Sequence, residues 1–351
     1  MELIIGNKKT ISWINYAKAI CMLVVILFHT EWYSDYRLYI LEDFYEPFFT
    51  NTFFFLSGYL LFRKQLSQPV IDEKVAEWIK NGGRKMVLNV LYRIAIPSVL
   101  FTIIVFLPKK LIRGEVIAYK DLLIESIGGC CYWFTSALVI AELIMFILLL
   151  TRYRQISFYF FISVLIAFLG IYYKQNPLYF CGNENFPWCY AKGMRAMAYL
   201  AIGAVFWKYE NSVSVLFEHF NKYFILLFIT IVYFIMIMTV NNCDEWIIKN
   251  FCVLIRDSFG ILLIIRLCML IKKFDWLSFI GVNSLGFYLF SGAIPNVYVL
   301  LFNRFSVIPM PIKFAIVYLL SISTIYIILL FLTRFSPWMF DLRLLRKKHV
   351  L

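Results

Sequence analysis

The sequence predicts an all-α polytopic membrane protein with about ten transmembrane helices, and three observations support this fold class. Of the 351 residues, 62% are hydrophobic and 16% charged, whereas soluble domains have about 45–50% apolar and about 25% charged residues. Apolar runs long enough to cross a bilayer recur along the chain. Lys and Arg are more frequent in the amino-terminal segment and in every second loop, which the positive-inside rule assigns to the cytoplasm. We therefore expect both termini in the cytoplasm and one integral membrane domain over residues 1–351.

The expected spans are apolar runs bounded by charged residues or by Pro- and Gly-containing segments. The first run has no small-residue cleavage site after it, so we expect a retained span and not a signal peptide. The polar segment 63–86 is expected to include an amphipathic helix on the membrane surface, and segment 174–193 a loop. The ten spans are expected at about residues 11–31, 47–62, 86–107, 130–150, 156–173, 194–207, 223–240, 246–271, 277–302 and 312–332.

Charge and cysteine content argue against several classes of partner. The net charge of +13 fits basic cytoplasmic loops, and no nucleic-acid-binding motif accompanies it. The eight cysteines have no metal-ligand spacing, so neither a metal nor a tightly bound cofactor is expected. Cys181 and Cys189 share one loop, and a disulfide between them is open if that loop faces an oxidising compartment. The lipid bilayer is the one partner that composition alone implies.

The run KAICMLVVILFH, from Lys18 to His29, is the most informative part of the first span. Its cation and its imidazole are eleven residues apart, which is about three helical turns, so both lie on one helix face roughly 16 Å apart. Ionisable groups within a span are functional candidates because burying them costs free energy.

His29 is the only histidine within an expected span, since His219 is expected in a loop and His349 in the tail. Imidazole titrates near neutral pH and can take a proton from a hydroxyl or a thiol and return it. The alternative is a structural histidine that bonds to a neighbouring helix near the outer interface. Position within the span favours the catalytic interpretation.

Several cations gather at the opposite, cytoplasmic end of this span, and together they suit a phosphate-bearing ligand. Lys18 alone is better explained as a snorkelling anchor. Arg93 lies inside the third span four residues before Pro97, which removes a helix hydrogen bond and can open a cavity. The residues of this group are Lys18, Arg63, Lys64, Arg84, Lys85 and Arg93.

Five further residues in or near spans have both a structural and an active-site interpretation. Ser57 precedes Gly58, and small residues at a packing face are commoner than nucleophiles. Arg256 and Asp257 are adjacent and point about 100° apart, so they need separate partners or a shared water-filled cavity. Glu142 lies within an apolar run, and Trp133 fits an interfacial aromatic belt equally well.

Five segments, in order along nearly the whole chain, resemble motifs of the membrane-bound acyltransferase-3 family. Lys18–His29 is similar to the Arg-x10-His signature of that family's first span, with Lys in place of Arg, and FFFLSGYLLF at 53–62 is similar to its second-span motif. The other segments are RKMVLNVLYRIAIP at 84–97, YWFTSAL at 132–138 and FIGVNSLGFYLFSG at 279–292.

The resemblance implies a ten-span enzyme of the inner, cytoplasmic membrane. Such an enzyme takes an acyl group, usually acetyl, from cytoplasmic acyl-CoA, its co-substrate. It delivers the group to a hydroxyl of a glycan or glycolipid acceptor, as in O-acetylation of polysaccharides. His29 would be the catalytic base, with an acyl-His intermediate left open. Lys18, Arg84 and Arg93 would lie near the CoA phosphates.

Two departures from the family pattern bear on function. Lys18 lacks the bidentate fork of Arg, and Ser291 stands where many relatives have His. These departures leave open an inactive relative that retains the fold. The other alternative is a transporter or flippase for an anionic lipid or polysaccharide, which would use the same cations and the same intramembrane imidazole as a pathway. The acceptor and the acyl group are not specified by the sequence.

Overall fold

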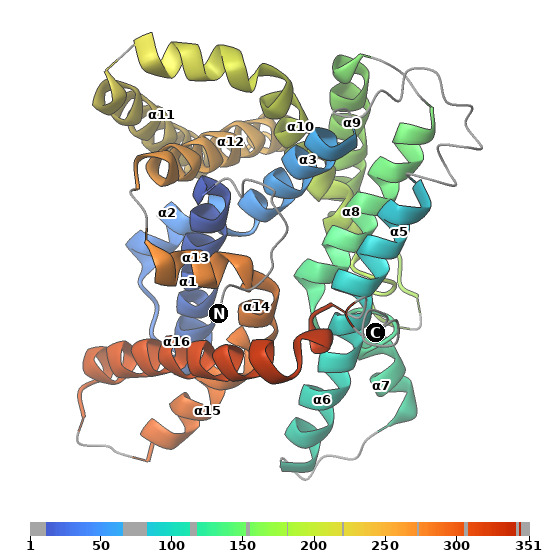
Figure 1. The fold of residues 1–351 in the computed structure, drawn as a ribbon, viewed down its shortest axis with the longest axis vertical. Coiled ribbons are helices and arrows are strands. Elements are labelled where there is room, and N and C mark those ends of the chain that lie inside the picture. Colours follow the sequence, from blue (N-terminus) through green and yellow to red (C-terminus); the bar gives the residue numbers. More distant parts are fainter. Residues whose placement is uncertain are drawn as a thin grey trace.

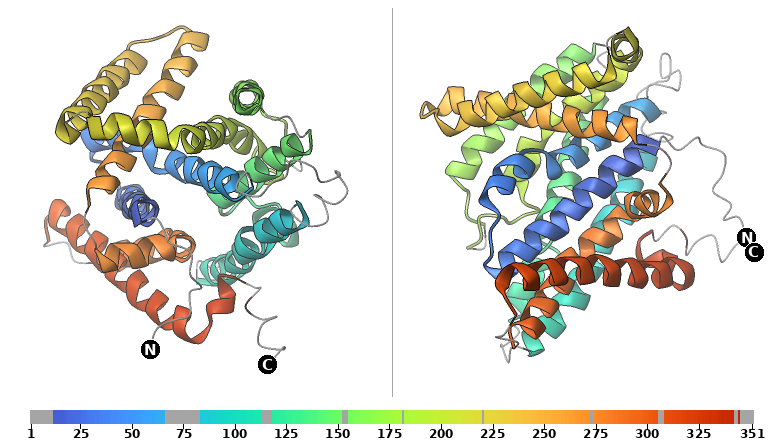
Figure 2. Two further views of the ribbon diagram at one scale, coloured as in Figure 1. Left: turned by 45° about the horizontal axis from the view of Figure 1, so that its top comes forward. Right: turned by 90° about the vertical axis from the view of Figure 1, so that its left-hand side faces the viewer.

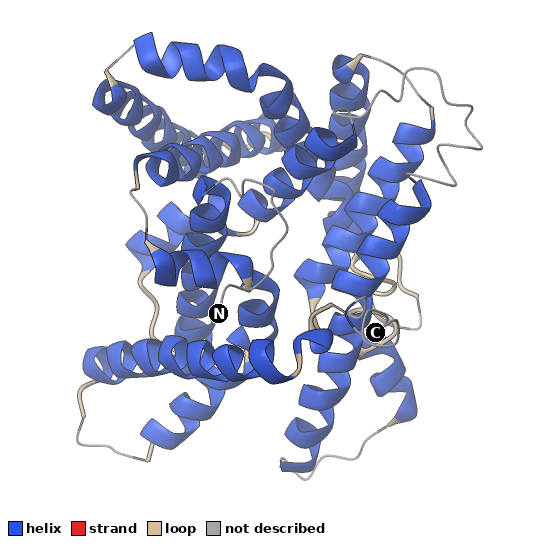
Figure 3. Cartoon of the chain, viewed as in Figure 1, coloured by secondary structure: helices blue, strands red, loops and turns tan. Residues whose placement is uncertain are grey.

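The computed structural model describes residues 12–65, 83–112, 118–151, 155–180, 182–219, 221–271, 274–304, 308–341 and 344. Within these ranges the chain is helical with short connections and contains no strand (Figure 3). The predicted all-α class is therefore confirmed for the described part of the chain. The predicted surface helix at 63–86 and the tail histidine lie largely or wholly outside it.

The first half of the described chain forms helices that alternate with short turns (Figure 1). Pro97 lies just after a π-helical turn, η2, and its missing N–H cannot complete the α-helical ladder. The elements are α1 (Ser12–Ser34), α2 (Tyr39–Phe49), α3 (Asn51–Gln65), α5 (Arg84–Val90), η2 (Leu91–Ala95), α6 (Ile96–Ile112), α7 (Tyr119–Glu125) and α8 (Trp133–Leu150).

The second half contains the longest helices. The elements are α9 (Ile156–Gln175), α10 (Tyr190–His219), α11 (Lys222–Asn241), α12 (Trp246–Leu270), α13 (Asp275–Val282), α14 (Ser284–Ser291), α15 (Ala293–Phe302), α16 (Met310–Phe335) and the short η3 (Pro337–Met339). His219 therefore ends α10 and does not lie in a loop as predicted. Helix α10 is much longer than the span expected at 194–207, because helix continues on both sides of the apolar run.

Six of the described helices are long and apolar enough to cross a bilayer, and the pair α14 and α15, bent by 41°, forms a candidate broken span. The six segments are Ser12–Ser34, Arg84–Val105, Trp133–Leu150, Ile156–Gln175, Tyr223–Asn241 and Met310–Phe335. The expected second span corresponds to α3, which has only 15 residues. The expected eighth corresponds to α12, which carries Lys249, Arg256, Asp257 and Arg266. The protein is thus a multi-pass membrane protein, whereas about ten spans and the orientation of the termini stay predictions.

Helix α1 occupies a central position in one group of helices. It packs against α2 and α3 and against α12 to α16, and in the left view of Figure 2 it is seen nearly end-on among its neighbours. Small side chains allow this close packing, since Ala17, Ala19 and Cys21 have no exposed surface. Helix α1, which carries Lys18 and His29, is therefore enclosed largely by other helices.

Helices α3, α8 and α9 pack around α10 in a second group. The backbones of α3 and α10 approach closely at two glycines. A Cβ atom at Gly58 would lie 1.9 Å from the carbonyl oxygen of Leu200, and one at Gly203 would lie 2.0 Å from that of Phe55. Only glycine fits at these positions, as at small-residue contacts in membranes.

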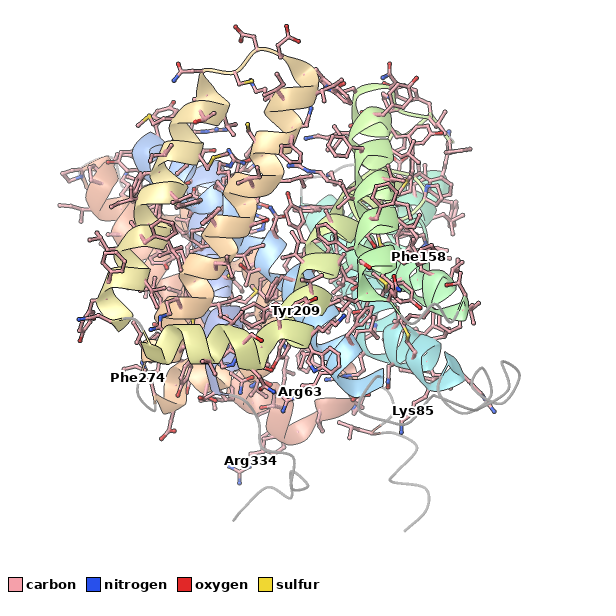
Figure 4. All side chains as sticks on the ribbon, turned by 90° about the horizontal axis from the view of Figure 1, so that it is seen from above. Arg63, Lys85, Phe158, Tyr209, Phe274 and Arg334 are labelled. Atoms are coloured by element: carbon pink, nitrogen blue, oxygen red, sulfur yellow. The ribbon has the colours of Figure 1, made fainter. Side chains whose placement is uncertain are left out.

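Figure 4 shows Arg63, Lys85 and Arg334 toward the same end of the molecule. The predicted topology assigns these three cations to the cytoplasmic side, so their grouping is consistent with it.

Candidate functional site

A cavity of about 270 Å³ contains the side chain of His29. Residues of α1, α2, α3, α8, α9, α10, α12 and α14 line it, so both groups of helices contribute. The charged lining residues that the structure describes are Glu46, Lys174, Lys192, Arg195, Arg256 and Asp257, and the aromatic ones include Trp133, Tyr199 and Tyr288.

His29 contacts aromatic rings but has no hydrogen-bond partner among the described residues. Its imidazole stacks on Tyr33, with ring centroids 6.1 Å apart, and meets the edge of Phe28 at 5.8 Å. Gly292 lies on another side of the ring, where an added Cβ would be in ordinary van der Waals contact, 3.9 Å from His29 Cε1. The rings fix the imidazole while its polar atoms stay available to a molecule in the cavity, as a general base requires.

Asp257 is a fully enclosed carboxylate at the centre of a polar network. Arg256 donates to its Oδ1 from Nε at 3.0 Å and from Nη2 at 2.9 Å. Asn51 Nδ2 donates to Oδ2 at 2.9 Å, and the Tyr199 hydroxyl also donates to Oδ2. Arg195 Nη2 lies 4.0 Å from the same oxygen. Three helices, α3, α10 and α12, are thereby tied together.

The sequence left two arrangements open for Arg256 and Asp257, separate partners or a shared cavity. In the structure both residues line one cavity, and the long guanidinium side chain bends back to pair with the adjacent carboxylate. Asp257 also has partners of its own, Asn51 and Tyr199.

Further cations stand at the same cavity. Lys192 Nζ lies 4.8 Å from the centroid of the Trp133 ring, within cation–π range. Lys174, at the exposed end of α9, is repelled by the like charges of Arg195 and Lys192 and attracted by the carboxylate of Glu46. Trp133 therefore faces the cavity and carries a cation on its ring, beyond any interfacial role.

The structure places two of the five further candidates, Ser57 and Glu142, outside this cavity. The Ser57 hydroxyl donates to the Glu142 carboxylate, which joins α3 to α8, and neither residue lines the cavity of His29. Their pairing fits the structural interpretation, in which a buried polar group is satisfied across a helix contact.

The cations at the other end of α1 are more dispersed. Lys18 is half-buried and is close enough to Arg93 for their like charges to repel. Arg93 Nε lies 3.7 Å from Asp341 Oδ2, and 60% of the Arg93 side chain is exposed. Arg63, Arg84 and Lys85 are exposed, and Lys64 is outside the residues whose side chains are described. None of the described members lines the His29 cavity.

Two further sequence expectations concern single residues. Ser291 is buried and its hydroxyl donates to the Tyr288 carbonyl at 2.7 Å, so it closes a local turn. Cys189 is a free thiol, and burial raises its pKa to about 11. Cys181, with which the sequence left a disulfide open, lies outside the described residues.

Sequence reasoning missed the contribution of α2, α9 and α10 to this cavity. Lys192, Arg195 and Tyr199 were expected in a loop or in the body of the sixth span, but α10 begins at Tyr190. Their spacing of three and four residues places them on one helix face. This shared face would have been visible in the sequence if the sixth helix had been expected to begin at Tyr190 and not at residue 194. Glu46 and Lys174 gave no comparable signal.

Comparison with known proteins identifies the family of the chain. A family model described as an acyltransferase domain, that of the acyltransferase-3 family, matches residues 11–332. No curated protein and no solved structure matches the chain.

Proposed function

Since the chain belongs to the acyltransferase-3 family and is a membrane acyltransferase, we propose that it transfers an acetyl group from acyl-CoA to a hydroxyl of an envelope or exported glycan. We further propose the inner membrane as its location and His29 as its catalytic base. The observation that carries the proposal is an imidazole without a hydrogen-bond partner in the described chain, held by aromatic rings at a polar cavity.

The chemistry follows from the position of the imidazole. His29 takes the proton of the acceptor hydroxyl as its oxygen attacks the thioester carbonyl carbon. The C–S bond then breaks, and the CoA thiolate takes the proton back from the imidazolium, so charge and protons balance. Because no carboxylate of the described chain hydrogen-bonds to His29, its tautomer is free to follow the substrate.

The donor is proposed to bind with its phosphates near the Lys18 end of α1. Lys18, Arg93, Arg84 and Lys85 supply positive charge there, and cations of this kind bind phosphate. The distance of roughly 16 Å along α1 then leaves the extended arm of CoA to carry the thioester toward His29.

The direct test uses purified full-length protein in a bilayer nanodisc with labelled acetyl-CoA and glycan extracted from the envelope of cells that lack the protein. We expect label on glycan hydroxyls with the wild type and none above background with His29→Ala. A protein that only transports would neither hydrolyse acetyl-CoA nor transfer the label, and that result would overturn the proposal.

A further inference from the structure

The cavity of His29 contains more positive than negative charge. Among its described lining residues, Lys174, Lys192, Arg195 and Arg256 face two carboxylates, Glu46 and Asp257. Lys192 and Arg195 are partly buried, so their charge interactions are stronger than in bulk water, whereas Lys174 is exposed. The excess therefore requires an account of its own.

Pairing within the cavity removes only part of this excess. Arg256 donates twice to one oxygen of Asp257, so these two residues neutralise each other. Arg195 is 4.0 Å from the other oxygen, which already accepts bonds from Asn51 and Tyr199. Glu46 is then the one remaining carboxylate of the described lining to balance three cations.

We propose that the acceptor carries an acidic group, a carboxylate or a phosphate, close to the hydroxyl that receives the acyl group. This inference rests on the proposed function and specifies its substrate class. The acidic group is bound and not transformed. It supplies counter-charge to Lys192 and Lys174, for which Glu46 is the one carboxylate left in the described lining, and to Arg195, which only shares Asp257 with Arg256. A guanidinium is well shaped for carboxylate or phosphate.

The neighbouring surface suits a sugar that bears such a group. Trp133 lines the cavity, and Lys192 covers one face of its ring, 4.8 Å from the centroid, so a sugar would contact the remaining surface of the indole. A sugar ring near Trp133 would therefore place an acidic substituent beside the ammonium group and its hydroxyls toward His29, which lines the same cavity.

The phosphates of the donor are the competing occupant of these cations. One feature favours the acceptor. A second set of cations lies at the other end of α1, around Lys18 and Arg93, where the donor phosphates have cations of their own.

The first experiment removes charge from the acceptor and leaves its hydroxyls in place. Glycan that accepts label from acetyl-CoA is either carboxyl-reduced or dephosphorylated, and transfer is measured with the purified full-length protein. We expect one treatment to lower kcat/KM about ten-fold or more, as for loss of one charged hydrogen bond. The affected arm identifies carboxylate or phosphate. If glycan from both treatments accepts label as well as untreated glycan does, the inference is overturned and the proposed function stands. No transfer to untreated glycan would overturn both.

The second experiment removes charge from the protein. Lys192→Gln should lower kcat/KM for the untreated acidic acceptor about ten-fold, leave its kcat/KM for the charge-depleted glycan unchanged, and leave KM for acetyl-CoA unchanged. The matched control is Lys249→Gln, an exposed lysine of α12 outside the cavity, which should change none of these values. A raised KM for acetyl-CoA in Lys192→Gln would assign the cations to the donor and contradict the inference.

Discussion

The two ends of α1 differ in how their ionisable groups are held. At one end, His29 lies in a cavity whose charged side chains come from four other helices, and three of them, Arg195, Arg256 and Asp257, belong to one network. At the other, Lys18 is half-buried among cations that are mostly exposed, such as Arg63, Arg84 and Lys85. The first end is preorganised, which is what electrostatic catalysis needs. The second resembles a charged entrance, whose interactions solvent and salt weaken.

The largest effect is expected at the preorganised end. His29→Ala should lower acyl transfer by about 10²–10⁴-fold, the usual contribution of a general base, while membrane accumulation stays normal. Acetyl transfer in nanodiscs and immunoblotting of membranes measure the two quantities. Tyr33→Phe, which keeps the stacked ring, is the control. Wild-type activity in His29→Ala would remove the distinction between the two ends.

The next prediction concerns stability and the hydrogen-bond network around Asp257. Asp257→Asn leaves Arg256 without its counter-charge in a buried setting, which should lower the free energy of unfolding by about 3–5 kcal/mol. Thermal unfolding in detergent, monitored by tryptophan fluorescence, measures the change in Tm. The control Asp244→Asn alters an exposed carboxylate and should have little effect. An unchanged Tm for Asp257→Asn would mean that the cavity is not preorganised by this residue.

At the Lys18 end we expect an effect on binding and not on chemistry. Lys18→Ala should raise KM for acyl-CoA by roughly five- to ten-fold with kcat nearly unchanged, as for one charged contact. Lys18→Arg should keep or lower KM, because Arg binds phosphate with two parallel donors. Steady-state kinetics at varied acetyl-CoA separate the constants. An unchanged acyl-CoA affinity in Lys18→Ala would count against the phosphate role.

The smallest effect is expected for the exposed cations. Arg84→Gln or Lys85→Gln should raise KM for acyl-CoA about two-fold at low salt, and the difference should vanish at high salt because exposed charges are screened. KM measured across a salt series tests this, with Lys120→Gln on α7 as control. A large effect that salt does not change would mean that this end is also a built site.

The sequence predicted the helical class, and four of its candidate residues, His29, Trp133, Arg256 and Asp257, line one cavity in the structure. Periodicity and the cost of buried charge carry that much information. It did not predict that Ser57 and Glu142 pair with each other, since partners 85 residues apart leave no local pattern. It also left Lys192 and Arg195 out of the site, because charged residues beside a Pro- and Gly-rich loop were assigned to the loop. Positions in a cavity built by eight helices depend on tertiary packing, which spacing along one helix does not encode.

The glycine contact between α3 and α10 has a consequence for the dimensions of the cavity. Asn51 on α3 and Tyr199 on α10 meet at Asp257, and Gly58 and Gly203 fix the separation of their helices. A methyl group at Gly58 would have to move from 1.9 Å to at least the ordinary contact distance of 3.4 Å from Leu200, which would wedge the helices apart. Two residues that contribute no atom to the cavity thus set its width, so acceptor selectivity can change through substitutions that never touch the acceptor.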